Sequence, residues 1–196
     1  MPTFISDPVP AVYLFWAAAL IGTAAVAAQR QDRKSGVTFL SVAVLFAVLF
    51  LLDRFIDSPR EEAVKNAQAM AAAADTNNPD EFVKHVADPF VYYSEGPPRT
   101  VTRSELKSSQ FWPMLRQFNV HVAVWSFSRG DVKVIDENTI EIGFLAKGES
   151  RNDMKGVPLY IRATYKRQSD GTMKLSEFRT FDAVNHEKPF TIPNFP

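Results

Sequence analysis

The chain has 196 residues and no formal net charge at pH 7, because 22 Lys and Arg balance 22 Asp and Glu. Without a basic surplus, bulk electrostatics gives no reason to expect nucleic-acid binding. The chain also has no cysteine, which excludes disulfide frameworks, thiolate zinc sites and cysteine nucleophiles. The mean hydropathy of −0.13 averages an apolar N-terminal part with a polar remainder, so the chain divides into two parts of different character.

Two apolar stretches open the chain. Residues 9–28 carry no charge, and residues 36–52 hold Val, Leu, Phe and Ala with Thr38 and Ser41 as polar breaks. A helix of roughly 20 residues crosses the apolar core of a bilayer. Both stretches are apolar on every face, which favours a membrane over burial as a helical pair in a soluble core. The sequence therefore predicts a transmembrane hairpin within residues 1–56, with helices at about 9–28 and 36–52 and the lipid bilayer as its partner.

The short polar segment between the two stretches sets the expected orientation. Residues 29–35 contain Arg30, Arg33 and Lys34 against a single Asp32, and basic residues in a short loop mark the cytoplasmic side. No Lys or Arg precedes the first stretch, which argues against a cleaved signal peptide. We therefore expect a multi-pass protein of the cell membrane, with its N-terminus and its C-terminal domain outside the cytoplasm.

The polar remainder has the length of one ordinary domain, and it begins with signals for helices. Ser58-Pro59-Arg60-Glu61 and Thr102-Arg103-Ser104-Glu105 match the capping box, and Asn78-Pro79 gives a similar start. Apolar residues recur at helical spacing after each signal. We expect a short strand over residues 90–93 and helices over 59–74, from 79 to just before Asp88-Pro89, and from 103 to about 118 with a bend at Pro113.

Beyond residue 118 the apolar pattern changes from helical spacing to alternation. Alternation predicts strands over residues 120–127, 132–135, 140–147, 157–166 and 173–182, followed by an irregular, proline-containing tail over 183–196. Helices followed by antiparallel strands predict an α+β domain over residues 57–182. The expected architecture is a cone-shaped domain of a curved antiparallel sheet packed on three helices, with an apolar pocket in the concave face.

Four local patterns are shared with a known superfamily. They are the first helix with its turn Asn77-Asn78-Pro79, the strand entry Val86-Ala87-Asp88-Pro89-Phe90, the helix opened by Thr102-Arg103-Ser104-Glu105-Leu106, and the closing hairpin of residues 162–175. Together they resemble the nuclear-transport-factor-2-like superfamily, also called SnoaL-like or cystatin-like cone proteins, over roughly residues 59–182. The resemblance implies an α+β cone with a pocket between sheet and helices, and often a homodimer through the sheet.

The superfamily hosts enzymes, binding modules and assembly domains, so the resemblance does not fix a reaction. The candidate pocket residues are Asp88, Tyr93, His121, Trp125 and Phe144. An isomerase- or dehydratase-type site needs a carboxylate or histidine beside a hydrogen-bond donor in an apolar pocket, and Asp88, Tyr93 and His121 have suitable side chains. Each also has a structural reading, with Asp88 as a turn residue, Tyr93 as core and His121 as an inner-wall histidine.

Metal and cofactor motifs do not occur in the sequence. The histidines are far apart in the chain, and there is no Gly-x-Gly-x-x-Gly, Walker or Gly-x-Ser-x-Gly motif. We expect no metal and no cofactor. The leading hypothesis is a membrane-anchored, non-catalytic domain that binds a small apolar ligand, or assembles with a partner or a second copy through its sheet. The alternative is an isomerase- or dehydratase-type enzyme that uses a polar residue pair in the pocket.

Overall fold

The computed structural model describes residues 10–55, 58–150, 156 and 158–196. The chain forms two compact units, Met1–Ser58 and Pro59–Pro196. The expected start of the first helix at residue 9 and the expected domain boundary at residues 56–57 lie outside the described residues. Each unit is built from its own elements and is described by itself.

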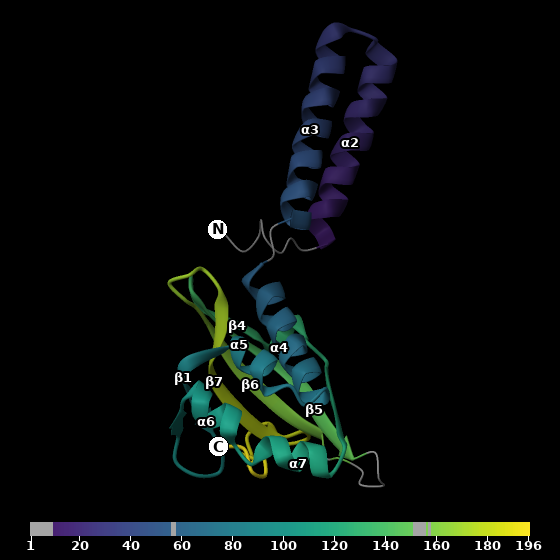
Figure 1. Ribbon diagram of the computed structural model, residues 1–196. Helices are drawn as coiled ribbons and strands as arrows, with labels where there is room; N and C mark the ends of the chain where they lie inside the picture. Colours follow the sequence, from purple (N-terminus) through teal and green to yellow (C-terminus); the bar gives the residue numbers. More distant parts are fainter. Residues whose placement is uncertain (1–9, 56–57, 151–155, 157) are drawn as a thin grey trace. The chain divides into compact units, whose positions relative to one another are not determined.

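The first unit contains two helices packed against each other, α2 (Pro10–Arg30) and α3 (Arg33–Phe55), in purple and blue in Figure 1. Only Gln31 and Asp32 connect them. Gln31 has a left-handed φ of 48°, and the Asp32 carboxylate accepts a hydrogen bond from the backbone N–H of Ser35 at 2.7 Å. Because Asp32 caps the new helix, α3 begins at Arg33, and the basic residues lie in the helices rather than in a longer turn.

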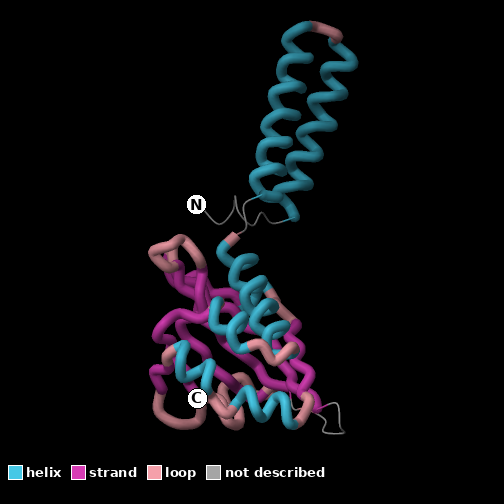
Figure 2. The backbone as a smooth tube through the Cα atoms, viewed as in Figure 1, coloured by secondary structure: helices cyan, strands magenta, loops and turns pink. Residues whose placement is uncertain are grey.

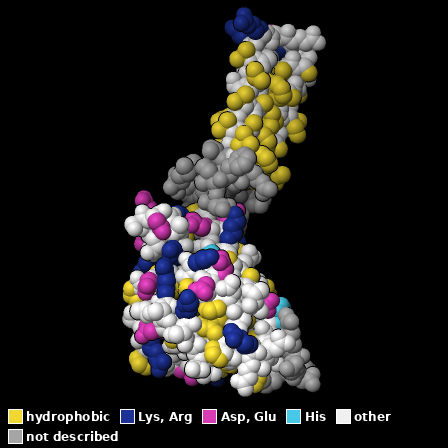
Figure 3. All heavy atoms as spheres, viewed as in Figure 1, with side chains coloured by type: hydrophobic (Ala, Val, Ile, Leu, Met, Phe, Trp, Pro, Cys, Tyr) yellow, Lys and Arg dark blue, Asp and Glu magenta, His cyan; other side chains and the backbone are white. Residues whose placement is uncertain are grey.

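Large apolar side chains of this hairpin are exposed. Leu14, Phe15 and Ile21 are 72%, 69% and 72% exposed, and Figure 3 shows hydrophobic side chains along the helices with basic ones at their connection. By length and composition, both helices suffice to cross a membrane, over Val12–Arg30 and Arg33–Leu51. Contact of so much apolar surface with water is unfavourable, so these helices suit an apolar environment better than water.

The second unit has helices and strands in the order expected, with one addition and one division. Its elements are α4 (Pro59–Asp75), α5 (Pro79–Lys84), β1 (Val86–Tyr93), β2 (Arg99–Val101), α6 (Arg103–Ser108), α7 (Phe111–Gln117), β3 (Val120–Trp125), the 3₁₀ turn η1 (Arg129–Asp131), β4 (Val132–Asp136), β5 (Thr139–Ser150), β6 (Pro158–Arg167) and β7 (Met173–Asp182). The added element is β2, which pairs with β1. Two of the expected helix caps are seen, at α5 and α6, where Asn78 accepts from the backbone N–H of Glu81 and Thr102 forms a capping box with Glu105.

The divided element is the helix expected from residue 103 to about 118, which is two helices, α6 and α7. The chain becomes extended at Ser109, with ψ of 156°. The Ser109 hydroxyl and the Trp112 indole N–H both donate to the carbonyl oxygen of Leu106, at 2.9 and 2.7 Å. These bonds satisfy the end of α6. Pro113 then lies in the first turn of α7, where its missing N–H has no intrahelical acceptor, so it does not bend a continuous helix.

The strands form one seven-stranded sheet in the order β2-β1-β7-β6-β5-β3, with β4 also paired to β5. Neighbouring pairs from β7 to β3 are antiparallel, but β1 runs parallel to β7. The sheet is therefore mixed, and the prediction of an antiparallel sheet is wrong in this respect. A parallel pair needs a long connection, and the elements from β2 to β6 supply it. Alternation predicts which segments are strands and leaves their pairing open.

The helices lie on one face of the sheet, as Figures 1 and 2 show. Helix α4 contacts β3, β5 and β7, and small buried side chains such as Ala63 and Ala67 let it approach the strands. Glu62 attaches its first turn to the sheet. The Glu62 carboxylate accepts from the backbone N–H of Met173 at 2.9 Å and pairs with Arg167 at 3.0 Å.

The tail after β7 folds back onto the second unit. The backbone N–H of Phe190 donates to the carbonyl oxygen of Thr180 at 2.9 Å, and the backbone N–H of Ile192 donates to the Tyr92 hydroxyl at 3.0 Å. The ring of Phe195 lies 4.9 Å from the ring of Tyr92. Although the tail contributes only an isolated bridge to the sheet, these contacts make it part of the wall of the unit.

Candidate functional site

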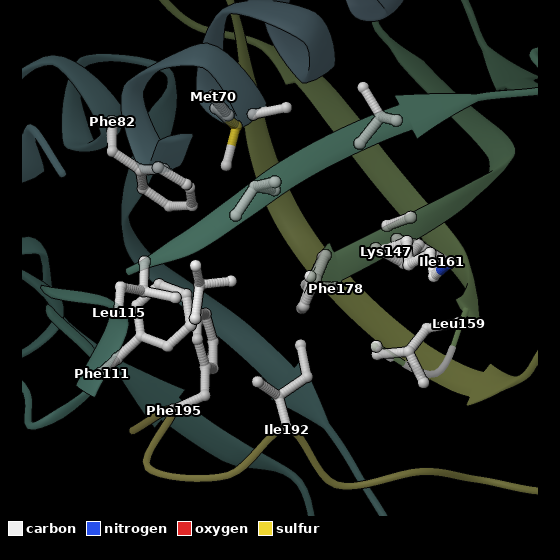
Figure 4. Close-up of a pocket in the computed structure, with 18 of the residues that line it drawn as sticks. Met70, Phe82, Phe111, Leu115, Lys147, Leu159, Ile161, Phe178, Ile192 and Phe195 are labelled. Carbon is white, nitrogen blue, oxygen red and sulfur yellow. The ribbon is translucent and has the colours of Figure 1, made fainter. Parts of the chain in front are cut away.

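A cavity of about 460 Å³ lies in the second unit, between the helices, the sheet and the tail. Ligand pockets usually have volumes of about 300–1,000 Å³. Its lining comes from α4, α5, α7, β3, β5, β6, β7 and the tail. Figure 4 shows aromatic and aliphatic side chains on both sides of the space, including Phe82, Phe111, Leu115, Leu159, Ile161 and Phe195. Elements from the whole length of the second unit thus meet around one apolar space.

The cavity exists because small side chains face it from two directions. Ala67, Ala71 and Ala74 of α4 line it from the helix, and Val122 and Val124 of β3 line it from the sheet. Residues two apart on a strand face the same side, so the valines present one apolar stripe. Larger side chains at these positions would fill the space between helix and sheet.

The tail closes part of the cavity wall. Phe190, Ile192, Pro193 and Phe195 line it, and the Phe195 ring lies 5.6 Å from that of Phe178 in β7. Sequence reasoning treated the tail as a separate irregular segment and missed this role. Its apolar residues between the prolines were the available signal.

Polar side chains are few in the lining and, among its described residues, belong to Lys147, Ser150 and Tyr165. The Ser150 hydroxyl donates to the carbonyl oxygen of Phe118 at 2.7 Å, and the Lys147 ammonium pairs with Glu149. Tyr165 is 1% exposed, and its hydroxyl has no hydrogen-bond partner in the described part of the chain. Burial raises the pKa of the Tyr165 hydroxyl above its ordinary value, so this group is protonated at neutral pH.

Of the five residues expected in the pocket, Phe144 lines the cavity. Tyr93 lies elsewhere, with the Arg179 guanidinium 4.3 Å from its ring centroid. Its neighbour Tyr92 is the buried one of the pair, 2% exposed, because successive strand residues point to opposite faces. Asp88 is exposed and accepts a hydrogen bond from the backbone N–H of Arg103 at 3.3 Å.

His121 and Trp125 also lie outside the cavity lining, on the outward face of β3. The His121 imidazole Nδ1 is 2.6 Å from Asp75 Oδ1, and Trp125 is 39% exposed. The expected inward face of this strand is therefore reversed. Ser126 has a left-handed φ of 65°, which breaks the alternation, so Phe127 turns back and stacks on Phe144 at 5.0 Å.

The candidate acid–base residues consequently do not converge. Asp88, Tyr93 and His121 belong to three different surroundings, and none lines the cavity. A search of the described residues finds no group of three or more His, Asp or Glu side chains that could hold a metal ion. What the lining offers is an apolar wall with a single buried phenol that is not engaged by the protein's described groups.

Comparison with known proteins identifies the fold of the second unit. No known family matches the sequence, and no curated protein matches it. Solved structures do match, at low identity. A domain of unknown function with a cystatin-like fold from Nostoc punctiforme shares 9% identity, covering 67% of this chain and 82% of its own, with a TM-score of 0.54.

An NTF2-like protein with a cystatin-like fold from Novosphingobium aromaticivorans shares 16% identity, covering 69% of this chain and 86% of its own, with a TM-score of 0.53. A protein from Kribbella flavida shares 20% identity, covering 62% and 88%, with a TM-score of 0.52. At such identities the likeness concerns the fold alone. The helices and curved mixed sheet of this chain have the NTF2-like, cystatin-like fold that its sequence patterns resemble.

Proposed function

We propose that this protein is a membrane-anchored NTF2-like domain that binds a small apolar ligand in its cavity without transforming it. The supporting observation is the cavity itself, about 460 Å³ in volume and lined almost wholly by apolar side chains. Each square ångström of apolar ligand surface removed from water contributes about 25 cal/mol to binding. A ligand enclosed by such walls gains affinity from burial, and few polar groups of the protein need rearrangement.

The proposal favours binding over isomerase or dehydratase chemistry because acid–base catalysis needs two polar groups near one substrate atom. Asp88, Tyr93 and His121 do not line the cavity. The Ser150 hydroxyl and the Lys147 ammonium are engaged with neighbouring groups. One phenol remains, which can orient a ligand but has no base beside it among the described lining residues.

The membrane anchor is the second part of the proposal, with α2 and α3 as transmembrane helices of the cell membrane. It is supported by their length, composition and exposed apolar side chains. Arg30, Arg33 and Lys34 at their connection favour the cytoplasmic side for this end, so the proposal includes a second unit outside the cytoplasm. Because the chain has no cysteine, Ser35→Cys and Asn185→Cys give single labelling sites.

A membrane-impermeant maleimide added to intact cells should label the Asn185→Cys chain and leave the Ser35→Cys chain unlabelled until the cells are opened. The reverse pattern would invert the orientation. If the two variants are labelled equally and the protein is recovered in the soluble fraction, α2 and α3 do not anchor the chain in a membrane.

We also propose a second copy of the chain as a partner through the sheet face that points away from the cavity. Trp125, 39% exposed, is the observation in favour, since large exposed aromatic side chains are enriched at interfaces. In nanodiscs, Trp125→Lys should shift the mass distribution of the protein from dimer to monomer. A monomeric wild-type chain at all concentrations would remove this part of the proposal.

Photoaffinity labelling tests the ligand proposal. The full chain in lipid nanodiscs is irradiated with a diazirine-bearing alkyl probe, and modified peptides are located by mass spectrometry. We expect modification in cavity-lining segments, strongly reduced by Val122→Phe, which fills the cavity. Ala123→Phe is the matched control, because it adds the same ring to the same strand on its exposed face. Modification confined to α2 and α3 would refute ligand binding in the cavity.

A further inference from the structure

The Tyr165 hydroxyl differs from the hydroxyls of neighbouring tyrosines. The Tyr92 hydroxyl accepts from the backbone N–H of Ile192 at 3.0 Å, and the Tyr160 hydroxyl donates to Asp131 at 3.1 Å. Tyr165 is as deeply buried as Tyr92, at 1% against 2% exposed. Its side chain lines the cavity, and its hydroxyl makes no hydrogen bond to the described residues.

A buried hydroxyl without a partner is unfavourable, and buried polar groups in folded proteins are nearly always paired. Phenylalanine would supply the same ring to the core without this cost. The position of Tyr165 suits a partner from inside the cavity. It pairs in register with Ile140 of β5 and Leu175 of β7, and Ala163 and Leu175 line the same space.

The partner's chemistry follows from the rest of the lining. A phenol is protonated at neutral pH, and burial raises the pKa of the Tyr165 hydroxyl further. The hydroxyl therefore keeps its proton and can donate a hydrogen bond. An anionic ligand would bury a charge, which is costly without a cation. Among the described lining residues the cationic group is the Lys147 ammonium, and it already pairs with Glu149. A neutral acceptor is therefore favoured over a carboxylate.

We propose that the Tyr165 hydroxyl donates a hydrogen bond to the bound ligand, so that the cavity selects neutral apolar molecules that carry an oxygen acceptor such as a ketone or ester. This inference rests on the proposed ligand-binding function and narrows it to a ligand class. Tyr165 acts as a specificity-determining residue, because a buried donor penalises an otherwise identical molecule without an acceptor.

The test uses two rigid probes that differ at one position, fluorene and 9-fluorenone. The latter has a carbonyl group where fluorene has a methylene. The full chain in nanodiscs is titrated with each probe. The signal from identical nanodiscs that carry the Val122→Phe chain is subtracted, because it reports the probe dissolved in the lipid. We expect 9-fluorenone to bind the wild-type chain roughly 3- to 10-fold more tightly than fluorene, the effect of one net hydrogen bond.

Tyr165→Phe should abolish this preference while keeping fluorene affinity. Tyr160→Phe is the matched control, because it removes a hydroxyl that bonds Asp131 and does not line the cavity, so it should keep the preference. The carbonyl stretching frequency of bound 9-fluorenone gives a second readout. It should lie at the lower, hydrogen-bonded position with the wild-type chain and shift upward with Tyr165→Phe, which a merely structural role of the ring would not produce.

The melting temperatures of the ligand-free variants give a further comparison of the two hydroxyls. Tyr165→Phe should leave the melting temperature unchanged or raise it, since the hydroxyl it removes has no partner among the described residues, whereas Tyr160→Phe should lower it by removing the hydrogen bond to Asp131. Equal binding of the two probes by the wild-type chain, or a preference that survives Tyr165→Phe, would overturn the inference and leave the ligand-binding proposal standing. Binding of neither probe would overturn the proposed function and the inference with it.

Discussion

Replacement of Phe195 by alanine measures how far the tail belongs to the folded domain. The Phe195 ring lies 4.9 Å from the ring of Tyr92, 5.4 Å from that of Phe111 and 5.6 Å from that of Phe178. These residues belong to β1, α7 and β7. The substitution therefore removes a side chain that joins three elements around the cavity.

The expected cost follows from burial. Truncation of a fully buried phenylalanine costs about 3–5 kcal/mol, but Phe195 is only half-buried. We therefore expect a loss of about 2–3 kcal/mol, with lost aromatic contacts included. For a domain of this size, such a loss lowers the melting temperature by roughly 5–10 °C.

The assay is thermal unfolding of the full chain in nanodiscs, followed by intrinsic tryptophan fluorescence, with urea unfolding for the free energy. Val184→Ala is the control in the same tail, since Val184 is 94% exposed and should change stability by less than about 0.5 kcal/mol. If Phe195→Ala behaves like Val184→Ala, the tail is not part of the cavity wall in solution.

Two further predictions concern pH and a helix cap. Burial lowers the pKa of His85 below its ordinary value of 6.5, so the unfolded chain binds the proton more readily, and stability should decrease as the pH falls through 6.5 toward the folded-state pKa. His85→Gln should flatten this part of a curve of unfolding free energy against pH, and an unchanged slope would assign the effect to other groups. Thr102→Ala removes the acceptor of the Glu105 N–H and should cost about 1 kcal/mol in urea unfolding. Thr100→Ala, on exposed β2, is the control, and equal losses in both would show that the cap contributes nothing.

Helix starts and strands were predicted correctly where a local sequence pattern is typical of one structure only. The capping pattern at Thr102 and the proline starts at Pro59 and Pro79 give helices at those positions, because local hydrogen bonds decide where a helix begins. The alternating segments form strands, because period-two burial is a local property of the chain. The order of these elements, together with four local patterns, resembles the cystatin-like fold, and solved structures with that fold match the chain.

Prediction failed where two faces of one strand were both apolar enough to be buried. On β3, Val120, Val122 and Val124 alternate with Ala123 and Trp125, and the aromatic set was expected inward. Packing against α4 selects the valines, and nothing in the local pattern encodes this choice. The same ambiguity applies to β1, where Tyr93 was expected to point inward but Tyr92 is the buried residue. These reversals moved most of the candidate site residues out of the cavity.

Other features depend on contacts distant in sequence. The parallel pairing of β1 with β7 and the return of the tail onto Tyr92 are settled by tertiary packing. That the Tyr165 hydroxyl has no partner among the described residues can be seen only from its neighbours in the fold. Sequence patterns therefore predicted the elements, the fold and an apolar pocket, and the structure was needed to identify the residues that line the pocket.

Methyl NMR of the full chain in nanodiscs, titrated with fluorene, shows whether an apolar ligand occupies the cavity. Binding there should shift the signals of the cavity methyl groups of Val122, Leu159 and Ile161. Val134 and Ile135, exposed on β4, serve as internal references that should not move. Shifts confined to the methyl groups of α2 and α3, or no shifts at all, would contradict ligand binding in the cavity.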